Sequence, residues 1–268
     1  MPNNLREYLN KNAKLIPLDD DSSFKFTCAK QCWGTCCREE HAGLLQLSVY
    51  DTYKMISHRP DLKTLELIQV KIENSTNLPR AYINWTSDRV CPNLMEDGIC
   101  KIYMDRPFAC SIFPMNAEFM ITDETKEINI SYKLRENMCF GFHKEANPEE
   151  QTLKSFLTAN SFNIYEEMEK LEILKRDEWS KKYDLKKLSD KQIHGLAQTL
   201  YCLKEKVTDK DIYFFDVLSD MLKIPRRTRK VEEFSNIDLT KLALNEFTPR
   251  LLEKYFNYSH HSEEGPQS

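Results

Sequence analysis

The sequence predicts an α+β fold in which a small cysteine-rich metal-binding module with few short strands precedes a mainly α-helical region. Two observations carry this prediction. Eight of the nine cysteines fall within the first 139 residues, and thiols at that density indicate a compact module built around metal ions or disulfides. After His143 the apolar residues change from short alternating runs to helical spacing. The hydrophobic content of 41% is enough for an ordinary core, so the size of the chain does not demand cross-links.

The cysteine density and the spacing of apolar residues divide the chain into four expected segments. Residues 1–23 are expected to form an N-terminal helical segment, and residues 24–146 the cysteine-cluster metal-binding module. Residues 147–258 are the expected helical region. The polar residues 259–268 are expected to be a disordered tail.

The elements of the cysteine-rich module are short. Ser48, with Asp51 three residues later, predicts a helix start, because a serine side chain can accept a hydrogen bond from a backbone N–H of the first turn. The other expected elements are a strand at residues 44–47, a helix at 62–72, a strand at 81–86 and a hairpin of 118–121 with 128–132.

The helical region carries three start signals. Asn147 before Pro148 predicts a helix that runs to about residue 174. Ser189 with Gln192 is a capping-box pattern, and Thr208 with Asp211 is similar. A last helix is expected over residues 239–255.

The hydropathy and net charge of the chain indicate its cellular compartment and the kinds of partner it could have. No stretch approaches the roughly 20 apolar residues of a membrane span, and the N-terminus lacks the apolar run of a signal peptide. We therefore expect a cytoplasmic chain with no membrane association. Disulfides rarely persist in the cytoplasm, so clustered cysteines there more often hold metal. The formal net charge of −4 gives no reason to expect nucleic acid as a partner. A protein partner stays open.

The expected metal ligands are thiolates alone: Cys28, Cys32, Cys36, Cys37, Cys91, Cys100, Cys110 and Cys139. All-sulfur ligation favours iron–sulfur clusters or zinc and argues against calcium and magnesium, which prefer oxygen. Eight thiolates divide into two sets of four, the ligand count of a cubane cluster or of a four-cysteine zinc site. A single four-thiolate site with spare cysteines is the alternative. No pair has the C-x2-C spacing of thioredoxin-like or zinc-ribbon motifs.

The second half of this cysteine set carries a longer motif. The chain reads Cys91-Pro92-Asn93-Leu94, then Gly98-Ile99-Cys100-Lys101-Ile102-Tyr103, Arg106-Pro107, Cys110 and Phe113-Pro114. With Phe26 and Cys28 before it and Cys139 after it, this pattern resembles the bacterial YkgJ-like cysteine-cluster family of zinc- or iron-chelating domains, over about residues 24–145. The family's short form is C-x2-C-x2-C-C, whereas both gaps here hold three residues. That departure leaves open which cysteines share a metal.

The resemblance implies metal binding through the eight cysteines and little about a reaction. Soft thiolate sets without histidine suit both iron–sulfur clusters and zinc, and we favour the clusters, from which a redox or metal-handling role would follow. An enzyme is one alternative, either an iron–sulfur oxidoreductase or a protein lysine N-methylase, since flagellin lysine N-methylases carry a similar cysteine block. The chain has only six glycines and no glycine-rich nucleotide loop, which weakens the methylase reading. A closed structural zinc module and a disulfide-stapled interaction module are the remaining alternatives. Tyr103 and Arg106 are interpreted as scaffold, with Pro107 starting a turn that aims Cys110.

A few residues outside the cysteine motif are also candidates for a functional role. His41 and His143 lie close to cysteines, but single histidines near a metal module are more often surface groups than ligands. Cys202, on an expected helix, is interpreted as a buried inert thiol. The basic run over residues 223–230 is interpreted as a solvated loop.

Overall fold

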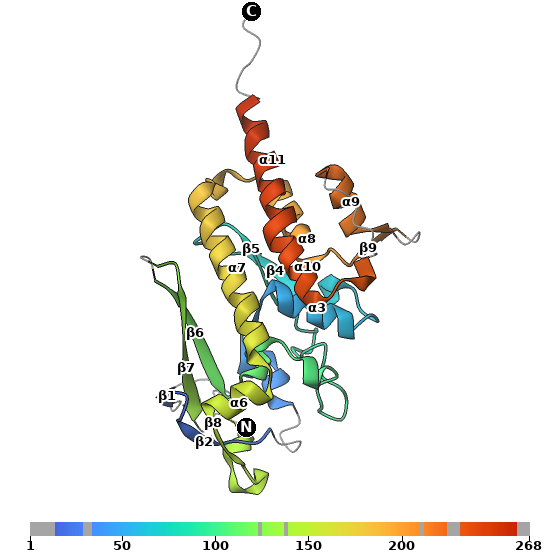
Figure 1. The fold of residues 1–268 in the computed structure, drawn as a ribbon. Coiled ribbons are helices and arrows are strands. Elements are labelled where there is room, and N and C mark those ends of the chain that lie inside the picture. Colours follow the sequence, from blue (N-terminus) through green and yellow to red (C-terminus); the bar gives the residue numbers. More distant parts are fainter. Residues whose placement is uncertain are drawn as a thin grey trace, which may run out of the picture. The chain divides into compact units, whose positions relative to one another are not determined.

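The computed structural model describes residues 14–28, 34–122, 125–136, 139–208, 212–223 and 231–261. The chain divides into two compact units that are both discontinuous in sequence. The first combines residues 1–45 with 83–170, and the second combines residues 46–82 with 171–268. The predicted α+β class is confirmed, because short antiparallel sheets and helices are both present (Figure 1).

A long hairpin forms most of the first unit's sheet. Strand β6 (Met115–Ile121) pairs antiparallel with β7 (Ile128–Glu136), and β1 (Lys14–Leu18) pairs with the other edge of β7 (Figure 1). The predicted hairpin is therefore confirmed, and it is longer than its alternating pattern indicated. Pro17 lies in β1, an edge strand, which is where a residue without a backbone N–H is tolerated in a sheet.

The described part of the predicted N-terminal helical segment is extended instead of helical. Lys14–Leu18 forms β1 and Ser23–Lys25 forms β2, so the helical prediction is wrong there, while residues 1–13 lie outside the described residues. The weak helical spacing is overridden because β7 and β8 (Glu150–Thr152) supply backbone hydrogen-bond partners to these strands.

The helix start predicted at Asn147 is also wrong, although most of the stretch predicted to be helical after it forms α6 and α7. Asn147 has a left-handed backbone with φ 49° and ends a short 3₁₀ turn, and residues 150–152 form β8 against β2. Helix α6 (Leu153–Ala159) starts only after this strand, with Thr152 as its N-cap. A break at Ser161, where φ is 54°, separates α6 from α7 (Phe162–Lys182).

Aromatic rings fill the core of the first unit around the short helix α5 (Phe108–Ser111). The Phe108 ring lies 5.9 Å from Phe119, 5.6 Å from Phe162 and 5.7 Å from Tyr165. The Tyr165 hydroxyl donates to the carbonyl of Arg106 at 2.6 Å. These contacts fix the start of α5 against β6 and the first half of α7.

The second unit contains the three-stranded sheet β3-β5-β4, formed by Gln46–Leu47, Pro79–Ile83 and Ile68–Ile72. The strands near residues 44–47 and 81–86 were predicted. The helix predicted over residues 62–72 forms only at α4 (Thr64–Leu67), and its second half is wrong because Ile68–Ile72 joins the sheet beside β5.

Helices make up the rest of the second unit. Ser48 caps α3 (Val49–His58) and Ser189 caps α8 (Asp190–Tyr201), both through capping boxes, so these two predicted starts are confirmed. Thr208 instead ends the short strand β9 (Lys206–Thr208), and the helix expected to start there begins only at Phe214. The remaining helices are α9 (Phe214–Met221), α10 (Asn236–Leu242), a π-helical turn (Ala243–Phe247) and α11 (Thr248–His261).

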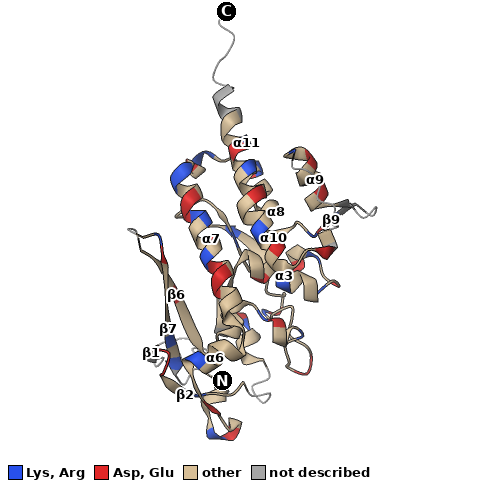
Figure 2. Ribbon diagram, in the orientation of Figure 1, with Lys and Arg blue, Asp and Glu red and all other residues tan. Residues whose placement is uncertain are grey.

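Charged side chains of both signs lie along α7 (Figure 2). None of the described helices combines the length and the apolar character needed to cross a bilayer.

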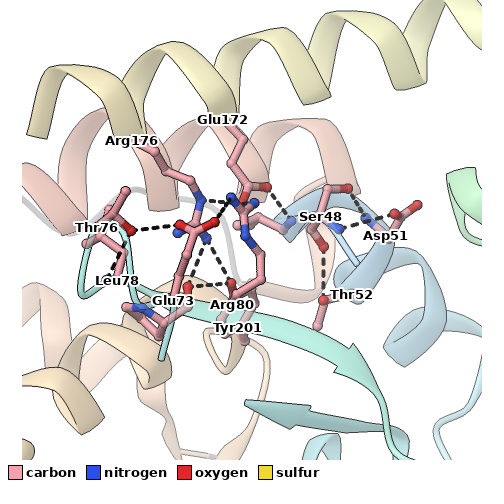
Figure 3. Close-up of polar contacts among 12 residues, drawn as sticks. Ser48, Asp51, Thr52, Glu73, Thr76, Leu78, Arg80, Glu172, Arg176 and Tyr201 are labelled. Carbon is pink, nitrogen blue, oxygen red and sulfur yellow. Dashed lines mark hydrogen bonds and ion pairs between the residues drawn. The ribbon is translucent and has the colours of Figure 1, made fainter. Parts of the chain in front are cut away.

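The second unit buries an ion network between β5, α3, α7 and α8 (Figure 3). Glu172 is 1% exposed; its carboxylate accepts from Arg176 Nε at 2.7 Å, from Arg80 Nη1 at 3.1 Å and from the Val49 backbone N–H at 2.7 Å. Arg176 Nη2 also donates to the Tyr201 hydroxyl at 3.0 Å. A buried carboxylate with three donors ties residues 46–82 to the C-terminal helices of the same unit.

Candidate metal centre

The adjacent cysteines Cys36 and Cys37 lie on a 3₁₀ turn, Thr35–Cys37, in the first unit. Gly34 precedes the turn with φ 65°, and its carbonyl accepts from the Cys37 N–H at 2.8 Å. A Cβ on Gly34 would lie 2.3 Å from Leu94 Cδ1 and 3.0 Å from the Gly98 carbonyl. Position 34 therefore requires glycine both for its backbone angles and for space.

Gly34→Ala tests how much this turn contributes. The left-handed backbone and the contact with Leu94 are each unfavourable for alanine, so we expect the free energy of unfolding to fall by about 1–3 kcal/mol. Gly195→Ala is the control, because Gly195 sits in α8 without a positive φ and its Cβ would meet only the Tyr255 side chain. Denaturant unfolding measures both. Equal losses for the two variants would contradict the special role of Gly34.

A short antiparallel contact brings Cys91 beside this turn. Arg38 and Val90 form an antiparallel bridge, and the Cys91 N–H donates to the Cys37 carbonyl at 2.8 Å. Cys91 is 9% exposed, whereas Cys36 is exposed. Residues more than fifty positions apart in sequence thus contribute thiols to one place.

Cys100 and Cys110 reach the same cluster from two further turns. Leu94 and Cys100 form a bridge that closes the loop after Cys91. Pro107 stands at the N-cap of α5, and its carbonyl accepts from the Cys110 N–H at 3.0 Å. Pro107 thus starts the turn that carries Cys110.

The thiols of Cys36, Cys37 and Cys91 interact with one another, and the single Cys37 proton can be donated to only one neighbouring sulfur at a time. Interaction with the other two thiols raises the pKa of Cys37, while interaction with Cys37 lowers the pKa of Cys91 and lowers the pKa of Cys36 to about 7. Two thiols of the cluster are therefore stabilised as thiolates by a third one.

The charges of the cluster also act on Cys100 and Cys110. Burial raises the pKa of Cys100 to about 11, with the Cys91 charge adding to it. Burial raises the pKa of Cys110 well above its ordinary value, and the charges of Cys91, Cys36 and Cys100 raise it further. The charges of Cys36 and Cys91 therefore act on both Cys100 and Cys110 within this unit.

Tyr103 and Arg106 contact this cluster. The Arg106 guanidinium lies 4.0 Å from the centre of the Tyr103 ring, and its Nε donates to the Tyr103 carbonyl at 2.9 Å. Burial and then a hydrogen bond from the Tyr103 phenol to Cys28 raise the pKa of Tyr103 to about 12. The Arg106 charge opposes the raised pKa of Cys100. From sequence, both residues were interpreted as scaffold. Their position between Cys100 and Cys110 in the motif could have indicated that they lie near the thiols.

Cys139 belongs to the same unit and lies near Gly141 and Thr27. Its sulfur accepts from the Gly141 N–H at 3.2 Å, and the Gly141 carbonyl accepts from Thr27 at 3.2 Å, next to Cys28. Cys32 lies outside the described residues, as does most of the basic run at 223–230.

Three residues outside the eight clustered cysteines remain to be placed: His143, His41 and Cys202. His143 is exposed, and the side chain of His41 is outside what the structure describes. Cys202 is buried at the end of α8 in the second unit, and burial raises its pKa.

The donor set suits a soft metal, but the ligands are not preassembled. Every described cysteine is a free thiol. Among the described residues, no group of three or more His, Cys, Asp or Glu side chains is arranged to hold a metal ion. Thiols within mutual electrostatic reach have the right chemistry for zinc or iron.

Comparison with known proteins agrees with this chemistry. Residues 27–156 match the family model described as "CxxCxxCC: Putative zinc- or iron-chelating domain". The match contains the eight clustered cysteines and leaves out Cys202. No curated protein and no solved structure matches the chain.

Proposed function

Because residues 27–156 form a domain of the CxxCxxCC family, we propose that this protein binds iron–sulfur clusters, or zinc as the alternative, through its eight clustered cysteines. The observation that carries the proposal is that Cys36, Cys37, Cys91, Cys100 and Cys110 belong to one compact unit, in which the charges of Cys36, Cys91 and Cys100 act on the Cys110 thiol. Such a set supplies the four thiolates of a metal site with one to spare.

The surroundings support a metal held by charged sulfurs. Four thiolates around a divalent metal carry excess negative charge, and the Arg106 guanidinium is placed to offset it. The Tyr103 phenol, whose pKa is raised by burial and in part by Cys28, is a neutral hydrogen-bond donor beside that sulfur. An iron–sulfur cluster, when bound, would supply one-electron chemistry, whereas zinc would supply a structural cross-link.

Solvent access favours a redox or metal-handling role over a closed structural one. Cys28 and Cys36 are exposed, while Cys91 is buried. A site with exposed ligands lets metal or electrons enter and leave. We place this activity in the cytoplasm, where reducing conditions keep the thiols available.

Metal analysis of the full chain tests the proposal. The protein is purified without oxygen, and iron, zinc and acid-labile sulfide are measured per chain. Iron and sulfide in matching amounts support the cluster, and stoichiometric zinc without sulfide supports the alternative. A chain that holds neither metal, and takes up neither after incubation with ferrous iron and sulfide or with zinc, would overturn the proposal.

A further inference from the structure

Cys37 and Cys91 are directly opposite each other in the short antiparallel contact. The bridge between Arg38 and Val90 sets this register, with hydrogen bonds from Cys91 N to Cys37 O at 2.8 Å and from Glu39 N to Arg89 O at 2.9 Å. Directly opposite residues in an antiparallel pair have Cα atoms about 4.5–5.5 Å apart, depending on the type of pair. Both values fall within the roughly 4.4–6.8 Å range that disulfides span.

The side chains of directly opposite residues lie on the same face of an antiparallel pair, with Cβ atoms about 4.5–5.5 Å apart. Each of these two thiols also shifts the pKa of the other. Cys36 is also within reach of Cys37, but a disulfide between neighbours would close a ring through their shared peptide bond and force it out of its preferred planar trans geometry. The geometry therefore singles out one pair among the clustered thiols.

We propose that Cys37 and Cys91 form a reversible disulfide when no metal occupies the site, and that a low-molecular-weight disulfide such as glutathione disulfide is the oxidant. Cys37, the more exposed of the two, first loses its thiol proton to solvent. Its thiolate then attacks glutathione disulfide, forms a mixed disulfide and releases one glutathione thiolate. The Cys91 sulfur then attacks the Cys37 sulfur and releases the second glutathione. The two thiol protons end on the two glutathione molecules.

This disulfide is a redox switch for metal uptake, a consequence that rests on the proposed metal-binding function. Sulfurs joined to each other no longer act as thiolate ligands, so the oxidised chain lacks two of the eight proposed thiolate donors. Reduction restores both. The reverse coupling also holds, since bound metal occupies the same sulfurs and protects them from oxidation.

Disulfide mapping of the metal-free full chain tests the inference. The chain is treated with a chelator and then with glutathione disulfide, free thiols are alkylated, and trypsin releases residues 31–38 and 90–101. We expect these peptides to be linked, with fragmentation placing the bond between Cys37 and Cys91. Cys37→Ser and Cys91→Ser should each abolish the link, and Cys202→Ala, the control, should retain it. Absence of this link, or a dominant link through Cys36 or Cys100, would overturn the inference.

A parallel sample loaded with zinc separates this inference from the metal proposal. Slower formation of the link with zinc bound supports the switch. Formation at an unchanged rate with zinc still bound would keep the disulfide but remove Cys37 and Cys91 from the ligand set, which overturns the switch. Zinc binding without any link in the metal-free chain would overturn the inference and leave the metal proposal intact.

Discussion

Replacing Glu172 with glutamine is expected to lower the free energy of unfolding by about 3–5 kcal/mol, the usual effect of removing one partner from a buried ion pair. The carboxylate accepts from Arg80, Arg176 and the Val49 N–H inside the second unit (Figure 3). A neutral amide of the same shape would leave two buried guanidinium groups, 8% and 4% exposed as whole residues, without their shared counter-charge.

Denaturant unfolding of the full chain measures this effect, and Glu178→Gln on the same helix is the matched control. Glu178 is 54% exposed and pairs with Lys175 at 2.8 Å on the surface. A surface ion pair contributes little, so this variant should stay within about 0.5 kcal/mol of the natural chain. Similar losses for the two variants would show that the buried network does not hold the second unit together.

The same carboxylate makes the stability of the second unit depend on acid. Burial acts to raise the pKa of Glu172, but the charges of Arg176 and Arg80 and the Val49 N–H outweigh it and hold the pKa below its ordinary value of 4.5. Folding thus reduces proton binding at this group, so its contribution is complete at neutral pH and is lost as the pH falls below about 4.5. Glu172→Gln should show a smaller loss of stability than the natural chain over this interval.

The second large effect is expected at the cysteine cluster. Cys36→Ser and Cys110→Ser should each lower the metal content of the purified chain and the thermal stability of its metal-bound form, since metal binding and folding of a small metal module are coupled. Removing an outer partner of a metal ligand typically reduces affinity by about 10–100-fold. Loss of a ligating thiolate should exceed that, as measured by competition with a chelator.

Cys202→Ala is the matched control for this prediction. Cys202 lies in the second unit and outside residues 27–156, so its loss should leave the metal content unchanged. Full metal retention and unchanged thermal stability in the Cys36 and Cys110 variants would rule out these two residues as ligands. A drop in the control variant instead would place a ligand outside the proposed cluster.

Sequence alone determined the features that rest on local patterns. The α+β class, the hairpin β6–β7 and the helices capped by Ser48 and Ser189 were all predicted, because alternation and capping act over a few neighbouring residues. The resemblance of residues 27–156 to a family of zinc- or iron-chelating domains was also recognisable from sequence, since the motif joins Cys91 to Phe113-Pro114 within one stretch of chain.

Tertiary structure alone decided the elements whose hydrogen-bond partners are distant in sequence. Residues 68–72 and 150–152 became strands, against helical expectations, because β5 and β2 offered them backbone partners. For the same reason residues 46–82 fold with the C-terminal helices, through the Glu172 network, and not with the cysteines that flank them.

The cysteine cluster shows both contributions. Sequence spacing identified which thiols to consider, but it could not show that Cys37 faces Cys91 across a backbone ladder or that Arg106 and Tyr103 lie against the sulfurs. Spacing along a chain constrains side chains only within a turn or a strand. Their meeting depends on long-range backbone pairing, which only the folded structure determines.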